Sequence, residues 1–102
     1  MQFDEFITLE NWGEEINNIR EYASDRSAYN KIKHLVENKD DENLFIFCVT
    51  MQNHGGYDEN SANGFKTSVS LSYSAEYPMA ETYLSLEKES DAAFKELVEY
   101  FE

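Results

Sequence analysis

A nearly unbroken apolar run, residues 44–51 (LFIFCVTM), leads directly into a polar, glycine-rich turn, residues 52–57 (QNHGGY). Continuous rather than alternating apolarity is typical of a strand that is covered on both faces, as in a parallel or mixed sheet. Ligands of open α/β sheets bind beyond the carboxyl ends of such strands. We therefore expect the turn to lie where a fold of this class carries its chemistry.

The flanking segments supply the other elements of an α/β fold. Ser24 or Asp25 can cap a helix over about 25–38. Strict alternation predicts an amphipathic strand over about 65–74, and Pro78 suits the first turn of a helix over about 78–101. Before residue 24 the signals are mixed, and we expect mainly loop. These elements make a partial three-layer α/β sandwich with 44–51 as its buried central strand, and too few strands for a whole catalytic sheet.

Charge and cysteine content narrow the function classes. The chain has 21 acidic and 8 basic residues, a formal charge of −13. This surplus disfavours nucleic acid and anionic membrane surfaces as partners. Cys48 is the one cysteine, so no internal disulfide forms, and we expect it to pack in the strand as a small apolar residue. No stretch reaches the roughly 18 apolar residues of a membrane span, so we expect the segment to be soluble.

His54 is the strongest candidate for chemistry. The glycine pair that follows it permits unusual backbone conformations and close approach of a ligand. An imidazole can donate to a phosphate or sulfate oxygen, and it can exchange a proton near pH 7. The alternative is a plain turn with an exposed histidine. The candidate substrate-binding residues are Thr50, Gln52, Asn53, His54 and Tyr57, with His54 also the candidate catalytic residue; none is a predicted metal ligand.

Other candidates have simpler interpretations. His34 falls within the first predicted helix, where a solvent-facing or partly packed histidine is expected, and Trp12 is expected to pack. Asp25 and Asp91 each follow a serine at a helix-related position, which favours capping or surface roles over catalysis.

The segment from Thr50 to Tyr57 (TMQNHGGY) resembles the T-M-Q-N-H-G-x-Y segment of the lipoteichoic acid synthase-like sulfatase family, in the alkaline phosphatase superfamily. Weaker agreements flank it in the same order. They are Phe3 to Ile7, Ser24, Asp25 and Tyr29 before it, and Tyr83 to Leu86, Ser90 and Asp91 after it. The resemblance therefore covers nearly the whole chain.

The resemblance implies a catalytic role only for a larger protein. Family members carry an upstream threonine nucleophile and glutamate metal ligand, and a downstream Asp-His pair, none of which can be placed in this chain. We expect an internal segment of a larger catalytic domain that is inactive alone and holds no cofactor itself. Manganese or another divalent metal is implied for the parent protein, as are N-terminal membrane helices and an extracellular catalytic domain. The matching histidine contacts the substrate's phosphate or glycerol part, a role that carries over to His54 alone.

Two function classes follow. The first is a segment of a phospho- or sulfo-ester transferase or hydrolase, with glycerol phosphate transfer from phosphatidylglycerol as the leading reaction; its partners are the rest of the catalytic domain and the ester substrate. The alternative is a stand-alone acidic protein-interaction module without catalysis. For a segment cut from a larger sheet, the edges left by the missing strands predict self-association.

Overall fold

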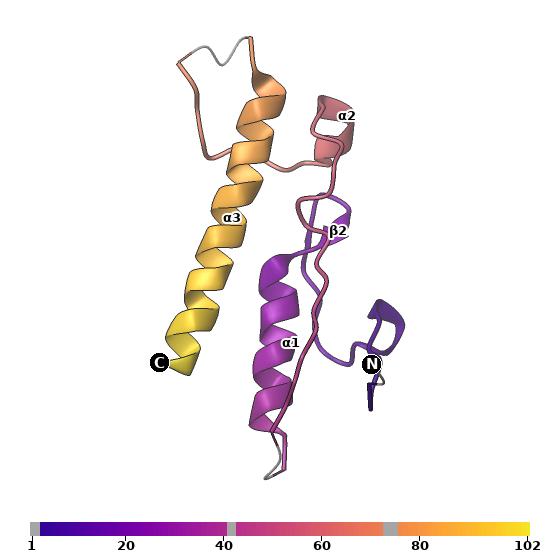
Figure 1. Cartoon of the computed structure of the whole chain (residues 1–102). Coiled ribbons are helices and arrows are strands. Elements are labelled where there is room, and N and C mark those ends of the chain that lie inside the picture. The colour runs from indigo at the N-terminus through magenta and orange to yellow at the C-terminus, as the bar shows by residue number, and fades with distance from the viewer. Residues whose placement is uncertain (1–2, 41–42, 73–75) are drawn as a thin grey trace.

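The computed structural model describes residues 3–40, 43–72 and 76–102. Its elements in chain order are η1 (Leu9–Asn11), β1 (Asn18–Ile19), β2 (Tyr22–Ala23), α1 (Asp25–Glu37), α2 (Glu59–Ala62) and α3 (Pro78–Phe101). The two long helices, α1 and α3, beside a small antiparallel sheet confirm a partial α/β fold (Figure 1).

Helix α1 begins where the sequence predicts it. Ser24 is the N-cap, and its hydroxyl oxygen accepts a hydrogen bond from the backbone N–H of Ser27 at 3.1 Å. The Ser27 hydroxyl in turn accepts from the N–H of Asn17 at 2.8 Å. This pair of serines therefore fixes both the start of α1 and the chain that leads into the β1–β2 hairpin.

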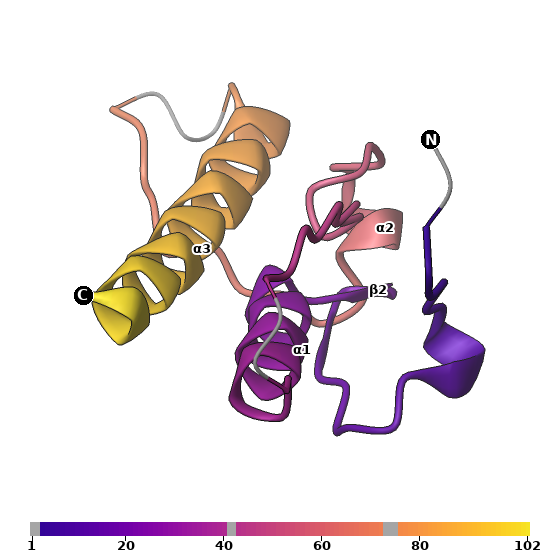
Figure 2. The same ribbon diagram turned by 60° about the horizontal axis from the view of Figure 1, so that its bottom comes forward.

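Helix α3 also matches its prediction, with Pro78 at its first position. It lies beside α1 at an inclined angle (Figures 1 and 2). Tyr29 of α1 meets Phe94 of α3 edge to face, with ring centroids 6.4 Å apart. The Arg26 guanidinium forms a two-pronged hydrogen bond with the Glu96 carboxylate at 2.9 and 3.2 Å. Aromatic and ionic contacts together hold the two helices.

The apolar run at 44–51 differs from its prediction as a buried central strand. It runs beside α1 (Figure 1), but within the described residues no strand partner pairs with it, and Phe47 and Val49 are each 72% exposed. Cys48 is likewise exposed rather than packed in a strand. The reason is that α1 covers one side only, while a strand needs neighbouring strands to satisfy its backbone. The only strand pair described is the short hairpin, in which Ile19 faces Tyr22.

The predicted strand at 65–74 is not formed over its described part, 65–72; residues 73 and 74 lie outside the described residues. Its backbone donors are satisfied by side chains of α3 instead. The N–H groups of Ser68 and Val69 donate to the Ser85 hydroxyl at 3.0 and 3.1 Å, and that of Leu71 donates to the Glu81 carboxylate at 2.7 Å. The segment is thus held against α3 without a strand partner.

The described core is small and the molecule is elongated. Buried apolar residues in the described ranges are Ala28, Leu86 and Ala93, and the principal extents are 54 × 30 × 26 Å. The radius of gyration is 16.2 Å, against about 13 Å for a compact domain of this length. Much apolar surface therefore faces outward.

Candidate functional site

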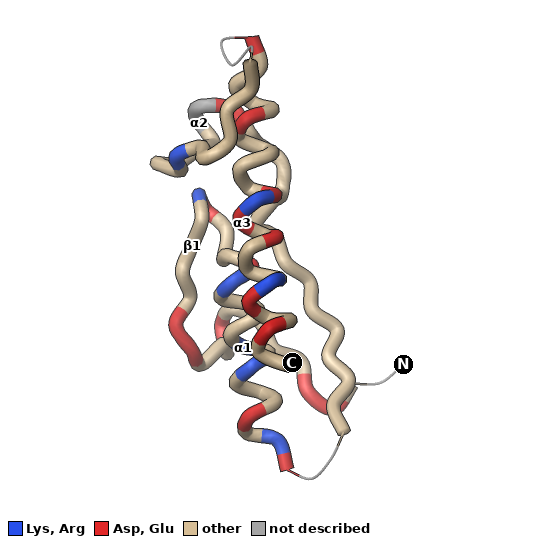
Figure 3. Tube along the Cα trace, turned by 90° about the vertical axis from the view of Figure 1, so that its left-hand side faces the viewer, with Lys and Arg blue, Asp and Glu red and all other residues tan. Residues whose placement is uncertain are grey.

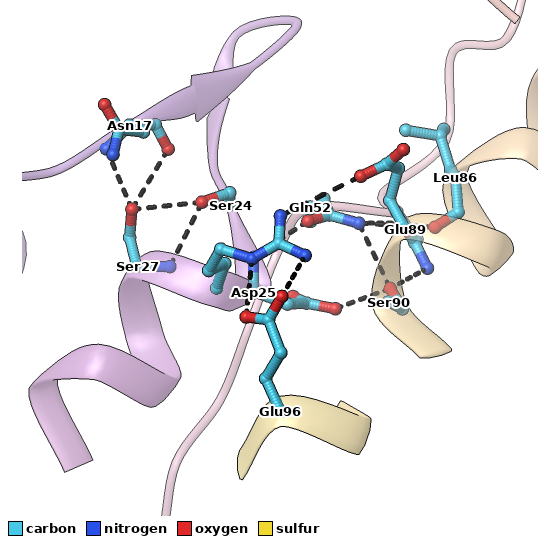
Figure 4. Close-up of polar contacts among 11 residues, drawn as sticks. Asn17, Ser24, Asp25, Ser27, Gln52, Leu86, Glu89, Ser90 and Glu96 are labelled. Carbon is cyan, nitrogen blue, oxygen red and sulfur yellow. Dashed lines mark hydrogen bonds and ion pairs between the residues drawn. The ribbon is translucent and has the colours of Figure 1, made fainter. Parts of the chain in front are cut away.

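The turn after the apolar run begins with a buried amide. Gln52 is 1% exposed, and its Oε1 accepts from the N–H of Asp25 at the start of α1 at 2.8 Å. Its Nε2 donates to the carbonyl of Leu86 at 3.3 Å and to the Ser90 hydroxyl at 3.1 Å. Figure 4 shows Gln52 between α1 and α3. One side chain thus joins the turn to both long helices.

Ser90 and Asp25 close this network on the other side. The Ser90 hydroxyl donates to Oδ2 of Asp25 at 2.6 Å (Figure 4). Asp25 is 5% exposed, and its Oδ1 is buried without a hydrogen-bond partner among the described residues. Both residues therefore serve the helix junction. The expected capping or surface role of Asp25 was wrong, because Ser24 caps α1 and the Asp25 side chain is buried against α3.

The next residue of the turn is also tied to α3. Nδ2 of Asn53 donates to the Ser90 hydroxyl at 2.8 Å and to the Glu87 carboxylate at 3.1 Å. The carbonyl of Asn53 accepts from the Tyr57 hydroxyl at 2.7 Å. The amides of Gln52 and Asn53, predicted as donors to a substrate, are engaged with the protein in this structure.

Arg20, which the sequence did not single out, holds the turn by its backbone. Its side chain reaches the carbonyl oxygens of three turn residues. Nη1 donates to Gly56 at 2.6 Å, and Nη2 donates to Gln52 and His54, each at 2.8 Å. Arg20 is 6% exposed, and its charge-assisted hydrogen bond to Gln52 is buried while those to His54 and Gly56 are partly buried.

Two aromatic rings flank the Arg20 guanidinium. Its central carbon lies 5.4 Å from the ring centroid of Tyr22 and 5.7 Å from that of Tyr57. The Tyr57 ring also meets Tyr83 of α3 edge to face at 5.5 Å. Tyr57 therefore packs beside the guanidinium and against α3, at the end of the turn.

His54 is an exposed residue of the turn that Arg20 holds. Its backbone N–H donates to the carbonyl of Met51 at 3.0 Å, which closes the turn. Its Nδ1 lies 3.2 Å from the Tyr22 hydroxyl, and the two ring centroids are 5.4 Å apart. Within the described residues no hydrogen bond reaches Nε2. The imidazole is thus held at one nitrogen and open at the other.

Thr50 lies at the edge of a cavity of about 200 Å³ beside the hairpin. Tyr22 and Trp12 line the same cavity, whereas His54 is not part of its lining. Trp12 packs there, as expected, and Lys31 donates to its carbonyl at 2.6 Å. His34 is exposed and pairs with Glu14 at 2.9 Å, away from the turn.

Two pKa shifts mark the environment of the extended segment. Cys48 is exposed as a residue, yet partial desolvation of its thiol by neighbouring atoms, and then the Asp25 carboxylate, raises the pKa of that thiol above its usual value. The same two causes, with a small contribution from Cys48, raise the pKa of Tyr29. Acidic residues are spread along the chain, in the helices α1 and α3 as well as in the segments between the elements (Figure 3).

Sequence reasoning missed Arg20 and Tyr22 because no periodicity links them to the turn. Each lies at least 32 positions before its contacts there. Both residues lie in a six-residue hairpin, 18–23, and its two-residue strands are too short to be predicted from an alternating pattern.

No three His, Cys, Asp or Glu side chains come together as a metal-binding group in the ranges described. None of the described helices is both long and apolar enough to cross a lipid bilayer.

The sulfatase family model matches residues 1–102. No curated protein and no solved structure matches the chain. Because the family model spans every residue, from the hairpin through the His54 turn to α3, the chain belongs to the sulfatase family.

Proposed function

We propose that this chain supplies the substrate-binding histidine turn of a metal-dependent phospho- or sulfo-ester enzyme. The observation that carries this proposal is His54, an exposed imidazole on a turn whose carbonyls are fixed by a buried guanidinium. Rigid placement of a polar group that faces outward is what recognition of an ester oxygen requires. Membership of the sulfatase family gives the ester as the substrate class.

The open nitrogen of His54 sets its chemical role. An Nε2–H can donate to an anionic ester oxygen, and an imidazole can also pass a proton to a leaving group. Thr50 offers a hydroxyl at the neighbouring cavity. Gln52, Asn53 and Tyr57 act mainly through the shape of the turn, since their polar groups are hydrogen-bonded to the protein.

The chain acts as one segment of a larger catalytic domain. Its exposed apolar residues, Phe45, Phe47 and Val49 among them, suit coverage by further strands. No three potential metal ligands come together among the described residues. We assign the nucleophile and the metal ligands that the resemblance implies to the rest of the parent domain. We therefore expect no turnover from residues 1–102 alone.

Within the family, the reaction we favour is glycerol phosphate transfer from phosphatidylglycerol, as in lipoteichoic acid synthesis. Its support is the T-M-Q-N-H-G-G-Y motif from Thr50 to Tyr57. This assignment includes a manganese-dependent, membrane-anchored parent protein with an extracellular catalytic domain. Sulfate ester hydrolysis is the next candidate.

A non-catalytic interaction module is the second function considered. The observation that favours it is the unpaired segment 44–51, whose exposed backbone could add a strand from another chain. Such pairing predicts self-association of residues 1–102. A monomeric elution profile at high protein concentration would count against strand pairing through 44–51, and turnover that depends on His54 in the full-length protein would count against this function.

The test uses the full-length protein with manganese and a fluorescent phosphatidylglycerol analogue, and aryl sulfate as the second substrate. His54→Ala is compared with His34→Ala, which replaces the other histidine of the chain away from the turn. We expect His54→Ala to lower turnover by about 10²-fold or more, the usual scale for a lost proton-transfer group. His34→Ala should retain turnover. Equal turnover in both variants would refute the role of His54.

A further inference from the structure

The β1–β2 hairpin contains an unusual backbone conformation at the residue that holds the turn. Arg20 is the first residue of the two-residue connection between β1 and β2, and its φ is +60°. Left-handed backbone at this place favours glycine. Its carbonyl accepts from Nδ2 of Asn63, itself at φ +45°, at 3.1 Å. A strained non-glycine residue persists where its side chain is needed.

The Arg20 side chain stabilises the turn rather than the hairpin in which it lies. All three of its hydrogen bonds go to carbonyl oxygens of residues 52, 54 and 56, more than thirty positions away. A guanidinium is suited to this, because its planar fork offers several donors in fixed directions. The hairpin itself would form more easily with glycine at this position.

Tyr22 is the second hairpin residue that contacts the turn, and it faces Ile19 across the hairpin. Its hydroxyl is within hydrogen-bond distance of Nδ1 of His54, and no other acceptor for it lies among the described residues. A neutral imidazole has one donor and one acceptor nitrogen. If the phenol donates to Nδ1, the ring proton resides on Nε2, the nitrogen that is open.

We propose that Arg20 and Tyr22 are positioning residues, which fix the backbone of the turn and hold His54 in the Nε2–H tautomer facing the ester. This inference rests on the proposed contact between His54 and the substrate. Arg20 sets where the imidazole lies, and Tyr22 sets which nitrogen carries the proton. Neither residue needs to touch the substrate.

Arg20→Gly separates the side chain from the backbone conformation. Glycine suits φ +60°, so the hairpin should keep or gain stability while the three hydrogen bonds are lost. We expect kcat of the full-length protein to fall by about 10²-fold, the effect of a misplacement of roughly 1 Å. Arg20→Lys keeps the charge but not the fork, and should not restore kcat. Unchanged kcat in Arg20→Gly would overturn the role of Arg20.

Tyr22→Phe tests the tautomer through the NMR signals of the His54 ring nitrogens. These signals would not change if Tyr22 only stabilised the fold. In ¹⁵N-histidine-labelled full-length protein, assigned with His54→Gln, the wild type should show Nδ1 as the unprotonated nitrogen at a pH where the ring is neutral. Tyr22→Phe should give a mixture of tautomers. Tyr29→Phe, whose ring packs on Phe94 instead, should leave the His54 signals unchanged.

The two proposals fail in different ways. A wild-type Nδ1–H tautomer, or identical His54 signals in Tyr22→Phe, would overturn the positioning inference whatever the turnover. If Arg20→Gly does not fold, Arg20→Lys decides the role of Arg20, because a wild-type kcat in that variant would overturn it. Loss of turnover in His54→Ala together with full activity in Arg20→Gly and Tyr22→Phe would overturn this inference alone. Full activity in His54→Ala would overturn the proposed function, while a tautomer change in Tyr22→Phe would still support the geometry.

Discussion

Alanine at each of the two adjacent glycines of the turn should have opposite effects on stability. Gly56 has φ +99°, and a Cβ built there would lie 3.1 Å from Oγ and 3.3 Å from Cβ of Ser61. Its carbonyl is also held by Arg20 at 2.6 Å, so the peptide cannot rotate to relieve the contact without losing that hydrogen bond. Gly55 has neither restriction, because nothing lies within 4 Å of its added Cβ and its φ is not positive.

The magnitudes follow from these geometries. A left-handed conformation costs an L-residue about 1–2 kcal/mol, and crowding at Ser61 adds about 1 kcal/mol. Gly56→Ala should therefore destabilise the protein by about 2–3 kcal/mol. Gly55→Ala should stabilise it by about 0.4–1 kcal/mol, because alanine restricts the unfolded chain.

Urea unfolding of the two full-length variants beside the wild type provides the measurement, since a shift in midpoint at constant slope reports stability. The matched pair differs by one position and no other chemistry. A Gly56→Ala midpoint equal to that of Gly55→Ala would refute the reasoning, and with it the fixed conformation of the turn.

Three further predictions concern the surroundings of the turn. Gln52→Met, nearly equal in size, leaves the buried N–H of Asp25 without its acceptor and should cost about 1–3 kcal/mol in urea unfolding, whereas Asn30→Met at an exposed site of α1 should change little; equal midpoints would contradict this. The hydrogen bond from Arg26 lowers the pKa of Glu96, so its stabilisation is present above the unfolded-state pKa and is lost as the pH falls through the folded-state value. Glu96→Gln should accordingly lose less stability than the wild type between about pH 6 and pH 3, around the ordinary carboxyl pKa, and parallel pH profiles would argue against it. Because the pKa of Cys48 is raised, its alkylation by iodoacetamide, followed by mass spectrometry, should be half-maximal above pH 9.0, the ordinary thiol value; a lower midpoint would contradict the raised pKa.

The helices could be predicted because their signals are local. Ser24 as a cap and Pro78 as a first residue act within one turn of the helices that they begin. The position of the polar turn was also evident, because glycine and asparagine restrict what can follow an apolar run.

The strands and the details of the site depend on distant parts of the chain. Pairing of 44–51 requires partners that the described residues do not supply, and the donors of 65–72 are satisfied by Ser85 and Glu81 of α3. The burial of Gln52 could not be predicted either, since an amide in a polar turn is normally exposed; only packing between two helices provides its partners.

Support of the turn from its carbonyl side has a consequence for how such a site can change over time. The Arg20 side chain donates only to main-chain oxygens, which every amino acid possesses. Its hydrogen bonds are therefore largely independent of the residue types at positions 54 and 55. Random mutation there could exchange one outward-facing group for another while the scaffold persists. A single frame of this kind could serve enzymes with different ester preferences.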